Sequence, residues 1–210
     1  MSLGVPRPVY KESPSQTAGP YVHIGTNPNW VEITGVWEGD LGLVLVGPDT
    51  KGERILVRGR IFDGLGKPLN DALVEIWQAD ADGLYNSAEE RRGRADPNFA
   101  GWGRQPTHRE TGEFRFETIK PGRVPYTDGR PMAPHITVYI VARGINIGLH
   151  TRMYFGDEAA ANAECPVLKR IEHPSRRETL IAPRSEEDGL PVYTFDVHLQ
   201  GHHETVFFDV

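Results

Sequence analysis

The sequence predicts an all-β fold, a sandwich of two sheets with about eight strands and a few short helices. Three observations favour this fold. Short runs rich in Val, Ile, Tyr and Phe alternate apolar with polar residues. Glycine and proline, at 23 and 17 of 210 residues, separate these runs. No long stretch repeats apolar residues at the spacing of a helix.

The length and composition suit one domain with an elaborated terminus. A chain of 210 residues with 38% hydrophobic content can bury one substantial core. We therefore expect an extended N-terminal arm at 1–22 and a β-sandwich domain at 23–210. The arm is rich in proline and poor in apolar anchors, which predicts irregular, extended backbone. Its centre, SPSQTAGPYV, has small residues that let backbone approach a partner or ligand closely, although an ordinary surface arm is the alternative.

The first clear strands come in the region from residue 53 to 80. RILVRGRIFD and ALVEIWQAD each alternate apolar and polar residues, and GLGKPLND between them carries turn residues. We predict that they pair as a β-meander, with Ile55 and Val57 on one face of the first strand. Val74 and Ile76 share a face of the second. Before them, LGLVLVG at 41–47 could form a short strand.

The excursion at 79–112 shows little periodicity and is predicted to be irregular. Its DADG lacks the later ligands of a calcium loop, so a turn is the better interpretation. EERRGR at 89–94 fits a solvated segment, although an excursion this long in a compact domain is often functional.

The second half of the chain contains the strongest strand patterns. FRFETI and ITVYIVARG flank a Pro/Gly-rich loop, and His135 stands where the second of these strands begins. LHTRMYF predicts a further strand, 157–168 and 175–183 predict short helices, and PVYTFDVHLQ and HETVFFDV predict two closing strands.

Charge and hydropathy exclude several classes of function. The net charge is −6 with both signs interspersed, so we expect no nucleic-acid partner. No run approaches the roughly 18 apolar residues of a membrane span, and the N-terminus lacks a leader pattern, so we expect a cytoplasmic protein. The single Cys165 excludes a disulfide framework and predicts a small buried side chain. No GxSxG elbow or phosphate-binding loop occurs.

Histidine is the residue type that points to chemistry, because a β-sandwich can gather distant histidines around a metal. The pair His202-His203 lies in a polar segment and is expected to be solvated, and His150 fits a structural role. His135 is the candidate remnant of a metal site.

Several segments, in order from about Pro14 to Val210, resemble the intradiol ring-cleavage dioxygenases. They include WQADADGLY, RADPNFAGWGR, GEFRFETIKPG, MAPHITVYIVARG, LHTRMYF, CPVLKRI and the terminal YTFDVHLQG with ETVFFD. The resemblance implies an intradiol-type β-sandwich that opens a catechol ring between its two hydroxylated carbons, using O₂ and non-haem Fe(III). It also implies an iron held by two tyrosinates, two histidines and a solvent hydroxide, with the histidines in an H-x-H on one strand.

The sequence departs from this ligand pattern at three of its four positions. His135 matches the first histidine, but Thr137 stands where the second is required. Val124 stands at one tyrosine position, with Tyr126 displaced by two residues, and Arg91 lies near the other. The resemblance therefore implies a chain that binds no metal itself and keeps only a vestigial position at His135.

This departure is typical of the α subunit in two-chain members of the family, which the SPSQTAGPYVHIG and ARGIN segments also resemble. The implied partner is a homologous β subunit that holds Fe(III), in an α/β hetero-oligomer. The implied substrates are O₂ and a catechol with a ring carboxylate. No catalytic residue is expected in this chain alone. The implied substrate-pocket residues are Thr17, Gly19, Pro20, Tyr21 and Arg143.

Two roles are open for Arg143. As a substrate-pocket residue it would bind the ring carboxylate, which needs a local positive charge in an acidic protein. It could equally form an ion pair at an interface or on the surface. Two other functions stay open. One is a self-sufficient intradiol catechol dioxygenase with altered ligands. The other is a prealbumin-like binding module, which the predicted meander at 58–80 suggests.

Overall fold

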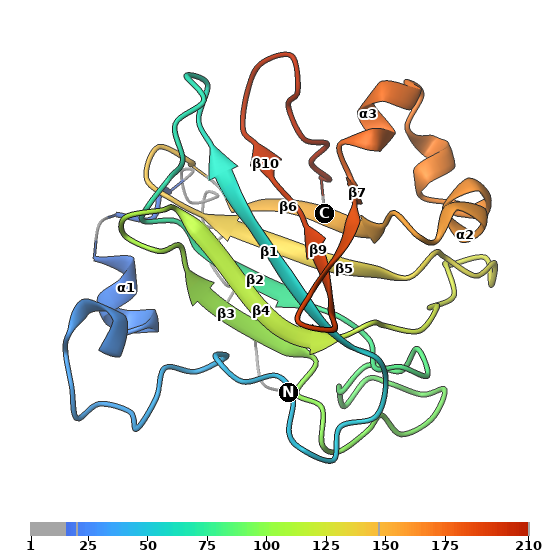
Figure 1. Ribbon diagram of the computed structural model, residues 1–210, viewed down its shortest axis with the longest axis horizontal. Coiled ribbons are helices and arrows are strands. Elements are labelled where there is room, and N and C mark those ends of the chain that lie inside the picture. Colours follow the sequence, from blue (N-terminus) through green and yellow to red (C-terminus); the bar gives the residue numbers. More distant parts are fainter. Residues whose placement is uncertain (1–15, 20, 147, 210) are drawn as a thin grey trace, which may run out of the picture.

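The computed structural model describes residues 16–19, 21–146 and 148–209, and within them two five-stranded sheets stack as a sandwich (Figure 1). The all-β prediction is confirmed, with short helices at the N-terminal side and after β6. The elements are α1 (Val22–Thr26), η1 (Asn29–Val31), β1 (Arg54–Phe62), β2 (Leu73–Trp77), β3 (Trp102–Pro106), β4 (Glu113–Ile119), β5 (His135–Val141), β6 (Leu149–Phe155), α2 (Ala159–Glu164), η2 (Leu168–Arg170), α3 (Pro174–Glu178), β7 (Ile181–Ala182), β8 (Arg184–Glu187), β9 (Leu190–Thr194) and β10 (Val197–His198).

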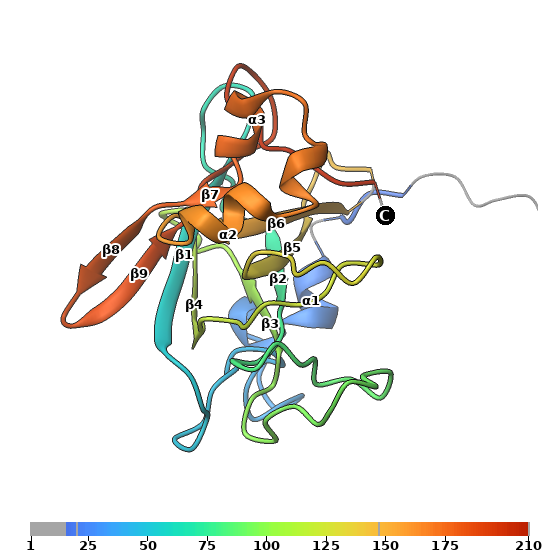
Figure 2. The same cartoon turned by 90° about the vertical axis from the view of Figure 1, so that its right-hand side faces the viewer.

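The first sheet is built around β1. Strand β4 pairs with it in antiparallel register, and β9 and β10 pair with it in parallel, with β8 beside β9. Gly59 lets the chain pass between β9 and β10, because a Cβ atom there would lie 1.9 Å from the carbonyl oxygen of Phe195. The β8–β9 hairpin projects from the body of the domain (Figure 2), and every residue of β8 is exposed.

The second sheet has the order β3-β2-β5-β6-β7. Alternate side chains of β2, β5 and β6 point toward the first sheet and form the main core, because successive residues of a strand face opposite sides. This core is fully buried and apolar. It includes Ile55, Val57, Val74, Ile76, Phe114, Phe116, Ile136, Val138, Ile140 and Met153.

The outer face of the second sheet is only partly covered. The segment that contains α2 and η2 packs over the end of β6, where Tyr154 joins a second apolar cluster with Ala161, Cys165 and Leu168. The prediction of a buried Cys165 is confirmed, since its exposed fraction is 0%. Over β2 and β3 this face stays open, and Trp77 is 51% exposed.

The predicted meander is wrong, although both of its strands exist and bury the predicted faces. β1 lies in the first sheet, while β2 pairs with β3 and β5 in the second. The connection at 63–72 therefore crosses from one sheet to the other. Both strands are buried on their core faces, and an apolar alternation of this kind fits either sheet equally well.

The strand and helix inventory also differs from the prediction. β3, β7 and β8 were not expected, nor were the N-terminal α1 and η1. Two predicted strands reduce to single bridges, Val46 to Phe99 in 41–47 and His150 to Phe208 in the C-terminal segment. In 41–47, Leu41, Leu43 and Val44 are exposed, so their apolar character does not reflect a buried strand.

Two smaller predictions are confirmed. The DADG segment is a turn, in which the Asp80 carboxylate accepts hydrogen bonds from the backbone of Asp82 and Leu84 at 3.0 and 2.8 Å. His202 and His203 are exposed. Among the described residues, no helix is both long and apolar enough to cross a membrane.

Candidate functional site

His135, which the sequence predicts as a vestigial metal position, is the first residue of β5. Its exposed fraction is 5%, and its Nδ1 lies 2.9 Å from the carbonyl oxygen of Ala133. Because a carbonyl only accepts, Nδ1 carries the proton and Nε2 is left as an acceptor. Burial, together with the positive charge of Arg152, lowers the pKa of His135 to about 4. The imidazole is therefore neutral at neutral pH.

A tyrosine and an arginine from β6 lie beside this histidine. The Tyr154 ring centroid is 5.6 Å from that of His135, and its buried hydroxyl has no hydrogen-bond partner among the described residues. Burial raises the pKa of Tyr154, so the phenol stays protonated. Arg152 lies across from Thr137 in the β5–β6 register. A guanidinium here disfavours further positive charge.

The three other predicted ligand positions hold Thr137, Val124 and Arg91, which are not iron ligands in this family's pattern. Thr137 is half-buried and lies between Trp77 and Arg152 on the neighbouring strands. Val124 is buried in the second apolar cluster. Arg91 is exposed and lies 3.5 Å from the Glu89 carboxylate. One imidazole beside a cation does not fit Fe(III), which prefers several anionic oxygen donors.

We also searched the described residues for another cluster of possible metal ligands. The residues that the structure describes contain no group of three or more His, Cys, Asp or Glu able to hold a metal. The displaced Tyr126 accepts a hydrogen bond from Arg170 at 2.7 Å. His150 packs on Tyr139 at a centroid distance of 4.6 Å, as a structural histidine would.

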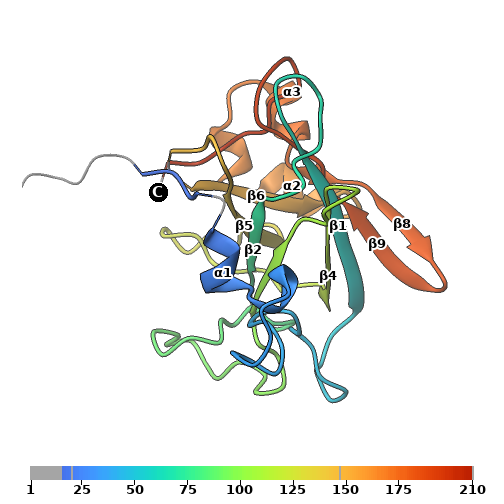
Figure 3. The ribbon, with the colours of Figure 1, turned by 90° about the vertical axis from the view of Figure 1, so that its left-hand side faces the viewer.

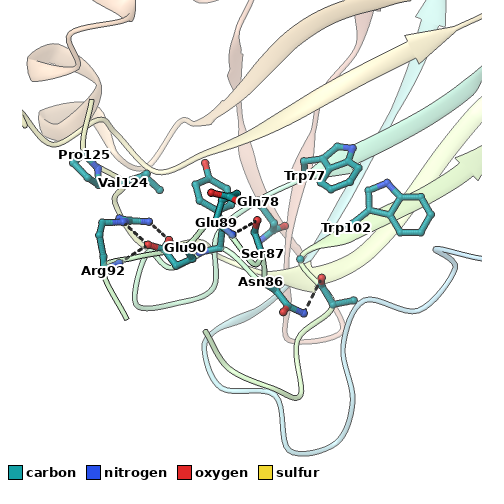
Figure 4. A pocket seen from close by; sticks show the side chains of 13 residues that line it. Trp77, Gln78, Asn86, Ser87, Glu89, Glu90, Arg92, Trp102, Val124 and Pro125 are labelled. Carbon is teal, nitrogen blue, oxygen red and sulfur yellow. Dashed lines mark hydrogen bonds and ion pairs between the residues drawn. The ribbon is translucent and has the colours of Figure 1, made fainter. Parts of the chain in front are cut away.

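A cavity of about 610 Å³ is lined in part by Val124, one of the predicted ligand positions (Figure 4). Trp77 and Trp102 form one wall, while Val124 and Pro125 lie opposite. The excursion after β2 supplies the rest of the lining, so this segment does shape a cavity, as its length suggested. Within it, the EERRGR segment is only partly solvated, because the Glu90 side chain is 6% exposed and pairs with Arg92 at 2.5 Å.

The predicted substrate-pocket residues lie at the other end of β5. Arg143 follows this strand, and its guanidinium forms an ion pair with the Asp71 carboxylate. The register explains the contact: Leu73 pairs with Val141, and two residues further on Asp71 comes opposite Arg143. Arg143 remains 61% exposed. It therefore makes a surface ion pair within this chain and still faces outward.

The arm reaches the same end of the sheet. His23 in α1 is buried, and its Nε2 lies 3.0 Å from the carbonyl oxygen of Asp71. Figure 3 shows α1 on the opposite side of the domain from the β8–β9 hairpin. Its ring packs on Trp30 at a centroid distance of 4.4 Å. Asp71 thus contacts both α1, which directly follows the arm, and Arg143.

The arm residues themselves face outward. Tyr21 is 76% exposed, Thr17 and Gly19 are exposed, and a Cβ atom on Gly19 would meet nothing within 4 Å. Pro20 lies outside the described residues. These side chains do not line the cavity. His135 and Val141, the first and last residues of β5, are six residue steps or about 20 Å apart. The two candidate regions are therefore separate.

Sequence reasoning missed three residues of these regions. Asp71 and His23 act through pairings of distant segments, and Arg152 matters only because β5 and β6 are neighbours. A known strand register would have revealed Asp71 and Arg152. No sequence signal marks His23, which lies in a helix of 5 residues without a side-chain cap.

Comparison with known proteins assigns the family. A family profile described as Dioxygenase matches residues 26–201. The dioxygenase domain of a dioxygenase–carbohydrate-binding protein fusion from Streptomyces sp. SirexAA-E superposes with a TM-score of 0.54 at 28% identity, covering 77% of this chain and 86% of that one. The chain belongs to the intradiol dioxygenases, a family of generally iron-dependent oxidoreductases.

Within this family, alpha and beta chains of protocatechuate 3,4-dioxygenases are similar to this chain to different extents. The protocatechuate 3,4-dioxygenase alpha chain of Pseudomonas putida is 49% identical over 207 residues, covering 98% of this chain and 100% of that one. The beta chain of the enzyme from Burkholderia cepacia is 38% identical over 164 residues, covering 73% and 67%. The similarity to an alpha chain therefore extends over both full lengths.

Proposed function

We propose that this chain is the alpha, non-iron-binding subunit of a protocatechuate 3,4-dioxygenase, assembled with a homologous beta subunit that holds Fe(III). The complex cleaves protocatechuate with O₂ to 3-carboxy-cis,cis-muconate, in the β-ketoadipate pathway of aromatic degradation, in the cytoplasm. One observation carries the proposal. Three of the four iron-ligand positions hold non-ligands, in a chain that aligns along its whole length with an alpha chain.

In this proposal the chain contributes a wall of the substrate pocket and not the metal. Thr17, Gly19 and Tyr21 of the arm are exposed. Pro20, adjacent in the sequence, is proposed to act with them. Arg143 lies at the same end, held by Asp71. A guanidinium has five N–H donors, so an arginine paired with one carboxylate retains donors for a second. The ring carboxylate of protocatechuate is the group that it would bind.

Arg143→Ala in the reconstituted complex is expected to lower kcat/KM for protocatechuate about 10- to 100-fold, the loss of one charge-assisted contact. Catechol, which has no carboxylate, should be affected much less. The measurement is steady-state kinetics with both substrates, with iron content determined in parallel. Iron content should not change, because Arg143 is not near a metal position.

Arg91→Ala is the matched control, since Arg91 is also exposed and paired with one acid. A second variant, Tyr21→Phe, tests the arm by the same readout and is expected to weaken substrate binding or turnover. If Arg143→Ala left the ratio of kcat/KM for protocatechuate to kcat/KM for catechol unchanged, Arg143 would not be a substrate-pocket residue. Loss of iron in that variant would also contradict the assignment.

No observation favours the two other functions. A self-sufficient intradiol enzyme needs a ligand set, and the described residues offer one buried imidazole beside Arg152. A prealbumin-like module rested on the meander that β1 and β2 do not form. Turnover by this chain without a partner would favour the first, and absence of turnover in the mixture with a beta chain would favour the second.

A further inference from the structure

Asp71 uses two different groups to contact two distant segments of the chain. Its carboxylate forms an ion pair with Arg143, which follows β5. Its backbone carbonyl oxygen lies 3.0 Å from Nε2 of His23 in α1, and α1 follows Tyr21 in the chain. Because the two contacts use separate groups, a substitution that changes only the side chain of Asp71 leaves the contact with His23 available.

The backbone around Asp71 is held on both sides. The next residue, Ala72, exchanges two hydrogen bonds with Thr107: its N–H donates to Oγ1 at 3.1 Å, and its carbonyl accepts from the Thr107 N–H at 2.8 Å. Both of these residues are 0% exposed. On the other side, the Asn70 amide donates to the carbonyl of Arg109 at 2.9 Å. Asp71 is therefore a fixed support for the groups that contact it.

The contact with α1 is buried and reinforced by packing. His23 is 3% exposed, and because a carbonyl only accepts, its Nε2 carries the proton. Its ring packs on Trp30 at a centroid distance of 4.4 Å. The guanidinium of Arg109 lies over the Trp30 ring at 4.6 Å and donates to the Trp30 carbonyl at 2.6 Å. These contacts fix the position of α1 relative to Asp71.

The contact with Arg143 engages one part of its guanidinium. The ion pair is made through Nε, and Arg143 forms no ion pair with another Asp or Glu among the described residues. The terminal edge of a guanidinium carries two parallel N–H groups, which match the two oxygens of a carboxylate. An arginine held at Nε can therefore present this edge to a second carboxylate.

Two effects of the Asp71 carboxylate on such binding have opposite signs. Its negative charge repels a second carboxylate, but the Arg143 side chain is 61% exposed, so solvent screens this repulsion. Its ion pair restricts a long, flexible side chain before the ligand arrives, which reduces the entropy lost on binding. We expect the second effect to be the larger.

We propose that Asp71 is a positioning residue of the substrate pocket, a role that rests on the proposed function of the chain. Its carboxylate holds the guanidinium of Arg143 with the terminal N–H groups free for the ring carboxylate of protocatechuate. Its carbonyl holds α1, which follows Tyr21, beside the same arginine. Asp71 acts through these two groups and not on the substrate.

Steady-state kinetics of Asp71→Asn, in the complex reconstituted with a beta subunit, test this role with protocatechuate and catechol. The variant keeps the size of the side chain and loses its charge. It is expected to raise KM for protocatechuate about fivefold and to change kcat less than about twofold, because a loosely held guanidinium binds the carboxylate less well. KM for catechol, which has no carboxylate, should change less than about twofold. Asp71→Glu keeps the charge and should recover part of the loss.

The double variant Asp71→Asn/Arg143→Ala separates positioning from a general structural effect. Its KM for protocatechuate should equal that of Arg143→Ala alone, because no guanidinium is left to hold. Glu113→Gln is the matched control, since Glu113 in β4 also pairs with one arginine, Arg60 at 3.7 Å, and its side chain is 32% exposed. Both of its KM values should match those of the wild type. Thermal unfolding shows whether each variant folds, and Asp71→Ala gives the same comparison if Asp71→Asn does not.

An unchanged or lower KM for protocatechuate in Asp71→Asn would overturn the positioning role. If Arg143→Ala is impaired in the same experiment, the proposed function stands. An equal loss for both substrates would also overturn the role, because a merely structural residue would have that effect. A wild-type complex that does not turn over protocatechuate would contradict the proposed function, and the role of Asp71 with it.

Discussion

Lys120→Met is expected to lower the free energy of unfolding by about 3 kcal/mol, because it removes the ammonium group that pairs with two carboxylates. The Lys120 Nζ lies 2.9 Å from Asp157 and 2.7 Å from Glu158, and its side chain is 15% exposed. The two acids are about one-third exposed, so we expect a loss at the lower end of the range for breaking a buried ion pair. Urea unfolding at neutral pH measures this change in the free energy of unfolding.

The cluster joins the two sheets, which is why its loss affects the whole fold. Lys120 follows β4 of the first sheet, and Asp157 follows β6 of the second. The Tyr193 hydroxyl of β9 donates to the same Asp157 carboxylate at 2.9 Å. Burial alone would lower the pKa of Lys120, but hydrogen bonds to Glu158 and Asp157 outweigh it and raise that pKa.

Lys67→Met is the control for Lys120→Met, since Lys67 is exposed in the connection between β1 and β2. It should change stability by less than about 0.5 kcal/mol. Lys120→Arg should retain part of the stability by keeping the charge. A loss below about 1 kcal/mol in Lys120→Met, with an unchanged m-value, would show that the cluster is no stronger than a surface pair.

His135 is expected to make stability fall as the pH is lowered from about 6.5 to about 4. Burial, then Arg152, lowers its pKa from 6.5 to about 4 in the folded state. At neutral pH both states are neutral and the group contributes nothing. As the pH falls through 6.5 the unfolded chain binds the proton first, so folding loses up to about 3 kcal/mol, and below pH 4 the loss is complete.

The difference in stability between the wild type and His135→Asn isolates this contribution. An asparagine amide can donate to the Ala133 carbonyl as Nδ1 does, but it does not titrate. The variant should lose about 3 kcal/mol less stability than the wild type between pH 7 and pH 4. His202→Asn, at an exposed position, should not differ from the wild type. A pH-independent difference for His135→Asn would mean that the imidazole is solvated or paired in solution.

The sequence predicted the strands in which alternate residues form a buried, apolar face, but it did not predict how these strands pair. The patterns at β1, β2, β4, β5 and β6 are of this kind. β3 was missed because its core-facing position is Gly103, packed under Leu45, and β8 because all of its residues are exposed. Pairing was wrong for β1 and β2, since strand order depends on contacts far apart in sequence.

Some features of the candidate site can likewise be predicted from the sequence, and others depend on strand pairing. The sequence predicts the loss of iron ligands at Thr137, Val124 and Arg91, because each departs from a motif that the chain otherwise resembles. The contact of Asp71 with Arg143 could not, because it follows from the β2–β5 register.

The iron content of this chain, purified alone and together with a beta subunit, tests the central claim most directly. We predict about one iron per alpha/beta pair and essentially none in the chain alone, because His135 is its only remaining ligand position. Turnover of protocatechuate should appear only in the mixture. About one tightly bound iron per chain in the protein purified alone, with the visible absorption of a tyrosinate–iron bond, would contradict this account.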